Sequence, residues 1–189
     1  RKNAPNRCFY CKQELVIHLK RVARERGFNA IAIGTNFDDL GDYRPGQQAA
    51  KEEGALAPLA EAGLTKEDIR QLSERLGIPT WNKPSFACLS SRFPYGEEIT
   101  REKLEMVDQA EQVLREYRFI QFRVRHHAKL ARIEVMPEEM LKLVENRAEI
   151  TRRLREIGYQ YVAMDLLGYR TGSLNEVLHQ IALPAGVKA

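Results

Sequence analysis

The stretch Ala30-Ile31-Ala32-Ile33-Gly34 decides the fold class of this chain. It is a short, continuous apolar run that ends in glycine, which is the pattern of a buried strand in a parallel sheet. Before it, apolar residues recur at helical spacing from about Lys12 to Arg26, and Gly27 ends the run. A helix followed by a buried strand is typical of the α/β class, so we predict an α/β fold here.

The polar stretch from Thr35 to Gly46 follows the C-terminal end of the predicted strand. Open parallel sheets place their ligands at this end of the strands, so the loop is a candidate binding segment. Further on, Thr65-Lys-Glu-Asp68 resembles a capping box and predicts a helix through Leu76, which Gly77 and Pro79 end. The segment from Trp81 to Gly96 shows no periodicity, and we interpret it as a functional loop or a hinge.

The second half of the chain has a different pattern. Thr100 caps an amphipathic helix to about Tyr117, and alternation predicts two strands in which Arg123 and Arg125 lie on the face opposite Phe122 and Val124. The predicted elements that complete a small α+β unit are the strands 121–126, 130–135 and 159–165 and the helices 137–146 and 148–157. We therefore predict two domains, residues 1–92 and residues 93–189.

Composition excludes some classes of protein. The chain has 189 residues, 43% of them hydrophobic, with a net charge of +4 and a pI near 9.0. No apolar run approaches the length of a membrane span and no secretory leader is recognisable, so we expect no membrane partner and a cytoplasmic location. The positive charge is too small to indicate nucleic acid as a partner.

The chain has three cysteines, Cys8 and Cys11 in a Cys-x-x-Cys pair and Cys88 in a loop rich in serine and arginine. Three thiolates can hold one iron-sulfur cluster and leave a fourth iron open. Spacing alone also allows a zinc site, a thiol relay or three inert buried thiols.

Taken together and in order, a set of segments resembles the LarE-type sulfurtransferases of the PP-loop ATP pyrophosphatase superfamily. The resemblance covers nearly the whole chain. It is carried by Gly34-Thr-Asn-Phe-Asp-Asp39, Asp42-Tyr-Arg-Pro-Gly46, Ala57-Pro-Leu59, Thr65-Lys66 with Ile69-Arg70, Leu76-Gly-Ile-Pro-Thr-Trp81, Lys83-Pro84, Cys88-Leu-Ser-Ser-Arg92, Pro94-Tyr-Gly96, Arg123-Val-Arg125, Ala131-Arg-Ile-Glu134 and Gly168-Tyr-Arg170.

The resemblance implies a doubly wound parallel sheet of the PP-loop (HUP-like) type, followed by a smaller α+β domain. It also implies adenylation of a carboxylate of pyridinium biscarboxylic acid mononucleotide by ATP with Mg²⁺, then sulfur insertion, in nickel-pincer cofactor biosynthesis. The Ser-Gly-Gly-x-Asp-Ser phosphate loop of the superfamily does not occur in the sequence. We therefore expect an N-terminally incomplete sheet and no ATP hydrolysis by these residues alone.

The resemblance assigns roles to individual residues. For ATP and Mg²⁺ they are Gly34, Asn36, Asp39 and Arg44, although Asp38 and Asp39 could merely start a turn and Arg44 could merely order the loop. For the substrate they are Ser91, Arg92, Arg123, Arg125 and Arg170, with a solvated strand face paired with Glu134 as the alternative for the arginines. For catalysis they are Cys88, Glu111 and Glu134.

Two sources of sulfur are compatible with this family. A 4Fe-4S cluster held by Cys8, Cys11 and Cys88 could deliver sulfide, or Cys88 could be sacrificed and become dehydroalanine. We favour the cluster because the sacrificial route leaves Cys8 and Cys11 without a role. Other classes remain open: a PP-loop tRNA thiolase or a non-enzymatic metal-binding module.

The remaining expectations concern assembly and the histidines. The family suggests a homohexamer. We expect His126 and His127 to lie on the surface and His18 to be structural.

Overall fold

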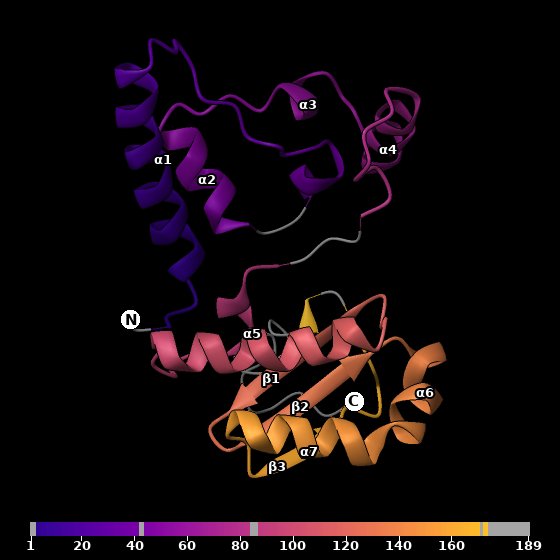
Figure 1. Cartoon of the computed structure of the whole chain (residues 1–189). Coiled ribbons are helices and arrows are strands. Elements are labelled where there is room, and N and C mark those ends of the chain that lie inside the picture. The colour runs from indigo at the N-terminus through magenta and orange to yellow at the C-terminus, as the bar shows by residue number, and fades with distance from the viewer. Residues whose placement is uncertain (1–2, 42–43, 84–86, 171, 174–189) are drawn as a thin grey trace, which may run out of the picture. The chain divides into compact units, whose positions relative to one another are not determined.

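The computed structural model describes residues 3–41, 44–83, 87–170 and 172–173, and they divide into two compact units (Figure 1). The N-terminal unit comprises Ala4–Lys83, and the C-terminal unit comprises Asn3 and the described residues from Ala87 onward. The sequence placed the boundary after Arg92, whereas here the loop that carries Cys88 and Arg92 belongs to the C-terminal unit. The reason is that Arg92 is buried against Glu111 in that unit.

The described part of the N-terminal unit is mainly helical. Its helices are α1 (Arg7–Glu25), the 3-10 helix η1 (Asp38–Gly41), α2 (Pro45–Glu52), α3 (Pro58–Glu61) and α4 (Lys66–Arg75). Helices α1 and α2 pack closely, and Gly46 permits this because a Cβ there would lie 3.2 Å from the carbonyl oxygen of Cys8. The predicted capping box of α4 is confirmed, since Asp68 N donates to Thr65 Oγ1 at 3.1 Å and Thr65 N donates to Asp68 Oδ2 at 2.9 Å.

The predicted buried strand at Ala30–Gly34 is wrong for the described residues. The segment forms only an isolated parallel bridge, in which Ile33 N donates to Leu56 O at 2.8 Å and Leu56 N donates to Ile31 O at 2.9 Å. A parallel strand is buried only when neighbouring strands and helices cover both of its faces, and a single bridge does not provide that cover. Its side chains therefore stay exposed or half-exposed.

The C-terminal unit has a small sheet with helices on one face. The elements are η2 (Leu89–Arg92), α5 (Arg101–Glu116), β1 (Phe122–His127), β2 (Leu130–Val135), η3 (Pro137–Glu139), α6 (Met140–Glu145), α7 (Arg147–Ile157) and β3 (Tyr161–Met164). The strand order is β1-β2-β3, with β1 and β2 antiparallel and β2 and β3 parallel. The strands and helices predicted here are confirmed, and so is the Thr100 cap of α5. The described fold is α/β with a mixed three-stranded sheet.

The core of the C-terminal unit lies between the sheet and helices α5 and α7 (Figure 1). Alternation along β1 and β2 sends the apolar side chains to this core; its members on the strands are Phe122, Val124, Ala131, Ile133 and Val135. The charged side chains of the same strands therefore lie on the opposite face of the sheet. None of the helices that the structure describes combines the length and apolar character that crossing a bilayer requires.

Candidate functional site

The charged face of the C-terminal sheet is buried. Register pairs Arg123 with Glu134 and Arg125 with Arg132 across β1 and β2. Arg123 is 4% exposed, Arg125 6% and Glu134 0%. The solvated charged face that the sequence allowed as an alternative is therefore not what the structure has, because charged side chains this deeply buried need specific partners.

Arg125 and Glu134 form a bidentate ion pair. Arg125 Nε donates to Glu134 Oε1 and Arg125 Nη2 donates to Glu134 Oε2, both at 2.9 Å. The same guanidinium donates from Nη1 to the carbonyl of Ser91 at 2.7 Å and from Nη2 to Ser173 Oγ at 2.7 Å. One arginine thus joins the strand, the η2 loop and the segment after Gly172.

A second bidentate pair joins Arg92 to Glu111 on α5. Arg92 Nε donates to Glu111 Oε1 at 2.7 Å and Nη2 donates to Oε2 at 3.0 Å, with both residues fully buried. Glu111 Oε1 also accepts the backbone N–H of Val124 at 3.1 Å. Arg92 Nη1 lies within hydrogen-bond distance of the carbonyl oxygens of Ala87 and Cys88, at 3.0 and 3.2 Å.

Arg123 contacts the backbone of β1 and the ring of Tyr169. Nη1 donates to the Phe122 carbonyl at 2.6 Å, Nη2 donates to Tyr169 Oη at 3.3 Å, and the guanidinium carbon lies 4.9 Å from the centre of the Tyr169 ring. Burial, followed by repulsion from the charge of Arg92, lowers the pKa of Arg123 from its ordinary value. An arginine stays charged at neutral pH even so, and a nearby anion would relieve this repulsion.

A glycine turn brings further charged groups to the same face. Gly168 has φ +69, and a Cβ there would lie 2.7 Å from the carbonyl oxygen of Val135, so only glycine fits without displacing the end of β2. The turn places Asp165 against Arg132 at 3.0 Å and Arg170 at 3.5 Å. Arg132 also donates to Glu134 at 3.1 Å.

We call this assembly the arginine network; its members are Arg92, Arg123, Arg125, Arg132, Arg170, Glu111, Glu134 and Asp165. Among its described members, arginines outnumber carboxylates five to three. Such a surplus of guanidinium groups suits recognition of a phosphate or carboxylate. The predicted substrate residues Ser91, Arg92, Arg123, Arg125 and Arg170 all belong to it or contact it.

The sequence missed three members of this face. Tyr169 contacts Arg123, Asp165 contacts both Arg132 and Arg170, and Ser173 contacts Arg125. The Gly168-Tyr169-Arg170 motif was the available signal, because a glycine before two large polar side chains indicates a tight turn.

The three cysteines are divided between the two units. Cys8 and Cys11 lie three residues apart in the first part of α1, and Cys88 precedes η2 in the C-terminal unit. All three are exposed free thiols. Within either unit taken alone, the described residues contain no group of three His, Cys, Asp or Glu side chains arranged to hold a metal ion.

The N-terminal unit has a cavity of about 510 Å³ beside the polar loop. Among the residues that line it are Thr35, Leu40, Arg44, Gln48 and Lys51. Arg44 lines the cavity and also forms an ion pair with Asp39, in which Arg44 Nη1 lies 2.8 Å from Asp39 Oδ1. The walls are largely apolar and carry two basic side chains, Arg44 and Lys51, and one carboxylate, Glu61. Apolar walls suit a nucleotide base, and the basic side chains suit its phosphates.

The other predicted nucleotide residues form a tight turn next to this cavity. Asn36 N donates to Asp39 Oδ2 and Asp39 N donates to Asn36 Oδ1, both at 3.1 Å, while Asp38 Oδ2 accepts the Lys66 amide at 2.8 Å. Both aspartates therefore have a structural role. Gly34 lies two residues before Asn36, and a Cβ placed there would meet none of the described atoms within 4 Å, its chain neighbours aside. The motif segments 42–43 and 84–86 lie outside the described residues.

The surface position expected for His126 is wrong. It is 2% exposed, its Nδ1 lies 3.2 Å from Tyr159 Oη, and its Nε2 lies 3.5 Å from Glu97 Oε1. Alternation along β1 explains this, because His126 follows Phe122 and Val124 at every second residue and so faces the covered side of the sheet. His127 is half-buried on the opposite face, and its Nε2 has no hydrogen-bond partner among the described residues.

From the burial of these histidines we predict that acid lowers the free energy of unfolding of the C-terminal unit. Burial is the main cause that lowers the pKa of both His126 and His127 from the ordinary value. Below about pH 6.5 the unfolded chain binds protons that the folded chain does not, so the free energy of unfolding falls as pH falls, by up to about 1.4 kcal/mol per pH unit for each histidine. Urea unfolding between about pH 7 and pH 5.5 measures this slope. His126→Gln should reduce the slope, and an unchanged slope in His126→Gln would contradict the assignment.

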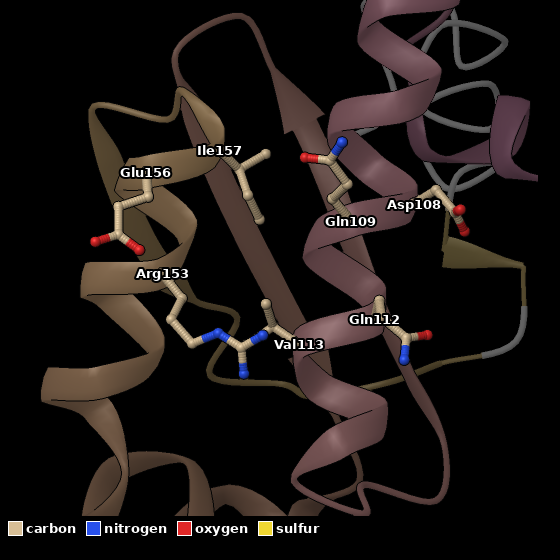
Figure 2. Close-up of a pocket in the computed structure, with 7 residues that line it drawn as sticks. All are labelled: Asp108, Gln109, Gln112, Val113, Arg153, Glu156 and Ile157. Atoms are coloured by element: carbon tan, nitrogen blue, oxygen red, sulfur yellow. The ribbon is translucent and has the colours of Figure 1, made fainter.

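A second cavity lies away from the arginine network. Figure 2 shows the side chains that line a groove between α5 and α7. The groove has a volume of about 450 Å³. It is lined by Asp108, Gln109, Gln112 and Val113 from α5 and by Arg153, Glu156 and Ile157 from α7. None of these seven residues is a predicted site residue. Arg153 is also engaged by Glu116 at 2.6 Å.

Comparison with known proteins identifies the family. No family model matches the chain. An uncharacterized protein of Synechocystis is 49% identical over 178 residues, which is 93% of this chain and 66% of the relative. An uncharacterized protein of Methanocaldococcus jannaschii is 32% identical over 170 residues, 90% of this chain and 66% of the relative.

A third relative has an informative name. The pyridinium-3,5-bisthiocarboxylic acid mononucleotide synthase of Lactiplantibacillus plantarum is 36% identical over 183 residues, 97% of this chain and 66% of the relative. The chain thus spans just under two thirds of the length of the curated relatives that it matches. Identity at this level along nearly the whole chain is enough to assign it: the chain belongs to the LarE-type family, together with the Lactiplantibacillus protein.

Proposed function

We propose that the protein carrying this sequence is a sulfurtransferase of nickel-pincer cofactor biosynthesis. Its substrate is pyridinium biscarboxylic acid mononucleotide, and its product carries a thiocarboxylate. The observation that carries this proposal is the arginine network, which gathers the buried guanidinium groups of Arg92, Arg123 and Arg125 in a relative of the mononucleotide synthase. A mononucleotide has both a phosphate and carboxylates that such a site can bind.

The proposed reaction has two steps. A carboxylate resists attack because it is anionic, so one of its oxygens first attacks the α-phosphorus of ATP and displaces pyrophosphate. Sulfur then attacks the resulting acyl-adenylate at its carbonyl carbon, and AMP leaves with the former carboxylate oxygen. The N-terminal cavity is the proposed nucleotide site, where Arg44 and Lys51 would contact the phosphates. Bound Mg²⁺ would offset the negative charge of the phosphates there.

For the sulfur source we propose a 4Fe-4S cluster held by Cys8, Cys11 and Cys88. The donor set fits, because all three thiols are exposed and thiolates are the normal ligands of such clusters. When bound, the cluster would supply the sulfide that replaces the carboxylate oxygen. We further propose that the N-terminal unit is part of a doubly wound PP-loop sheet, which the parallel bridge at Ala32 and Leu56 supports, and that the protein assembles as a homohexamer.

Binding of a pyridine mononucleotide tests the arginine site. Arg123→Gln should weaken the affinity for nicotinic acid mononucleotide, measured by calorimetry, by about tenfold to a hundredfold, the usual loss for a charge-assisted phosphate contact. The same change should leave the urea midpoint unchanged or raised, because it removes a buried charge next to Arg92. Arg153→Gln in the groove of Figure 2 is the matched control and should bind normally. Equal affinities of Arg123→Gln and the parent protein would refute the proposed site.

A further inference from the structure

The loop that carries Cys88 is held by its backbone. The carbonyl oxygen of Cys88 accepts from Ser91 N at 2.9 Å, from Ser91 Oγ at 2.8 Å and from Arg92 Nη1 at 3.2 Å. The carbonyl of Ala87 accepts from the same Arg92 nitrogen at 3.0 Å. The Cys88 side chain does not take part in these contacts and is exposed.

Two buried carboxylates bind the arginines that contact this loop. Glu111 accepts hydrogen bonds from Arg92 with both carboxylate oxygens, and its Oε1 also accepts the backbone N–H of Val124 on β1. Glu134 grips Arg125 with both oxygens, and Arg125 donates to the Ser91 carbonyl. Each carboxylate therefore reaches the loop through one arginine, Glu111 at the Cys88 end and Glu134 at Ser91.

Neither carboxylate is placed to touch a substrate. Both are 0% exposed, and each of their four oxygens lies within 3.0 Å of a guanidinium nitrogen. A general acid or base must come within hydrogen-bond reach of the reacting group, which a fully covered and bidentately paired carboxylate does not.

We propose that Glu111 and Glu134 are positioning residues, which fix the backbone of the Cys88–Arg92 loop through Arg92 and Arg125 and do not act on the substrate. This rests on the proposed function only in treating Cys88 as the sulfur-handling residue. Fixing the backbone while leaving the side chain exposed keeps the thiol in one place and open to its partner, which lowers the entropic cost of reaction.

Hydrogen exchange of the Ser91 amide tests the positioning role directly. In Glu111→Gln, one oxygen remains to accept from Arg92 but the charge is lost, and we expect the Ser91 amide to exchange about tenfold faster under native conditions. Glu116→Gln is the matched control, because Glu116 lies on the same helix and pairs with Arg153 away from the loop. Its Ser91 exchange should equal that of the parent protein.

A second variant keeps the test valid if Glu111→Gln fails to fold. Arg92→Lys retains a positive charge beside Glu111 but cannot span the carboxylate and both loop carbonyls, so it should also raise Ser91 exchange. Parent-like Ser91 exchange in a folded Glu111→Gln or Arg92→Lys protein would overturn the proposal, especially if sulfur transfer is lost, because the carboxylate would then act directly. Exchange is measured without substrate, so failure of the proposed sulfur transfer does not affect this result.

Discussion

Replacing Glu134 with alanine is expected to lower the free energy of unfolding of the C-terminal unit by about 3–5 kcal/mol, the typical cost of breaking a buried ion pair on one side. Arg125 would keep its charge at 6% exposure after losing both carboxylate contacts. Arg132 would lose its contact to Glu134 at the same time. Urea unfolding followed by circular dichroism measures the change.

Two further variants test whether the loss of stability comes from the buried ion pair. Glu116→Ala breaks the exposed pair with Arg153 and should change stability little, since exposed pairs contribute little. The double variant Arg125→Met with Glu134→Leu should recover most of the stability, because it removes both buried charges and keeps the volume. If Glu134→Ala is no less stable than Glu116→Ala, the pair is not buried as the structure describes.

Replacing Cys88 with serine is expected to abolish sulfur transfer to the mononucleotide while leaving the fold intact. The thiol is exposed, and among the described residues the contacts that hold the loop are made by the Cys88 carbonyl instead. Serine keeps that carbonyl and removes only the sulfur. The measurement is the amount of thiocarboxylate product formed by the protein that carries this sequence, with and without the Cys88→Ser change. Sulfur transfer that persists in Cys88→Ser would contradict both proposed sulfur sources.

The paired cysteines separate the two sulfur sources. With a cluster, Cys8→Ser and Cys11→Ser should also lose transfer, and anaerobic reconstitution should load about four irons per chain in the parent protein only. With sacrificial donation, both variants should stay active, and the mass of the used protein should fall by one H₂S at Cys88. His18→Gln on the same helix is the control and should bind iron like the parent protein.

The sequence predicted the C-terminal unit well because its signals are local. Alternation placed Arg123 and Arg125 opposite Phe122 and Val124, and the strands formed as expected. Thr65 and Asp68 predicted a capping box that the structure contains, since a cap involves residues only three apart. The same alternation puts His126 on the face of Phe122 and Val124, which is buried. The expected surface position of His126 is wrong because it does not follow this pattern.

Long-range features were predicted less well. The apolar run Ala30–Gly34 indicated a buried strand, yet burial depends on what covers the run, and only Leu56 pairs with it among the described residues. The arginines were recognised as anion ligands, but their partners come from residues up to 48 positions away in the chain. No spacing rule connects Arg125 with Ser173 or Arg92 with Glu111.

The sequence by itself determined the family, the α/β class, the alternating strands and the residue types available for anion and sulfur chemistry. These follow from motifs and from the periods of helices and strands, which are properties of neighbouring residues. Only the tertiary structure decided which guanidinium groups are bound by carboxylates and which side chains hold the Cys88 loop. That pairing is set by burial, because charges brought together out of water must be neutralised by whichever groups the fold places beside them.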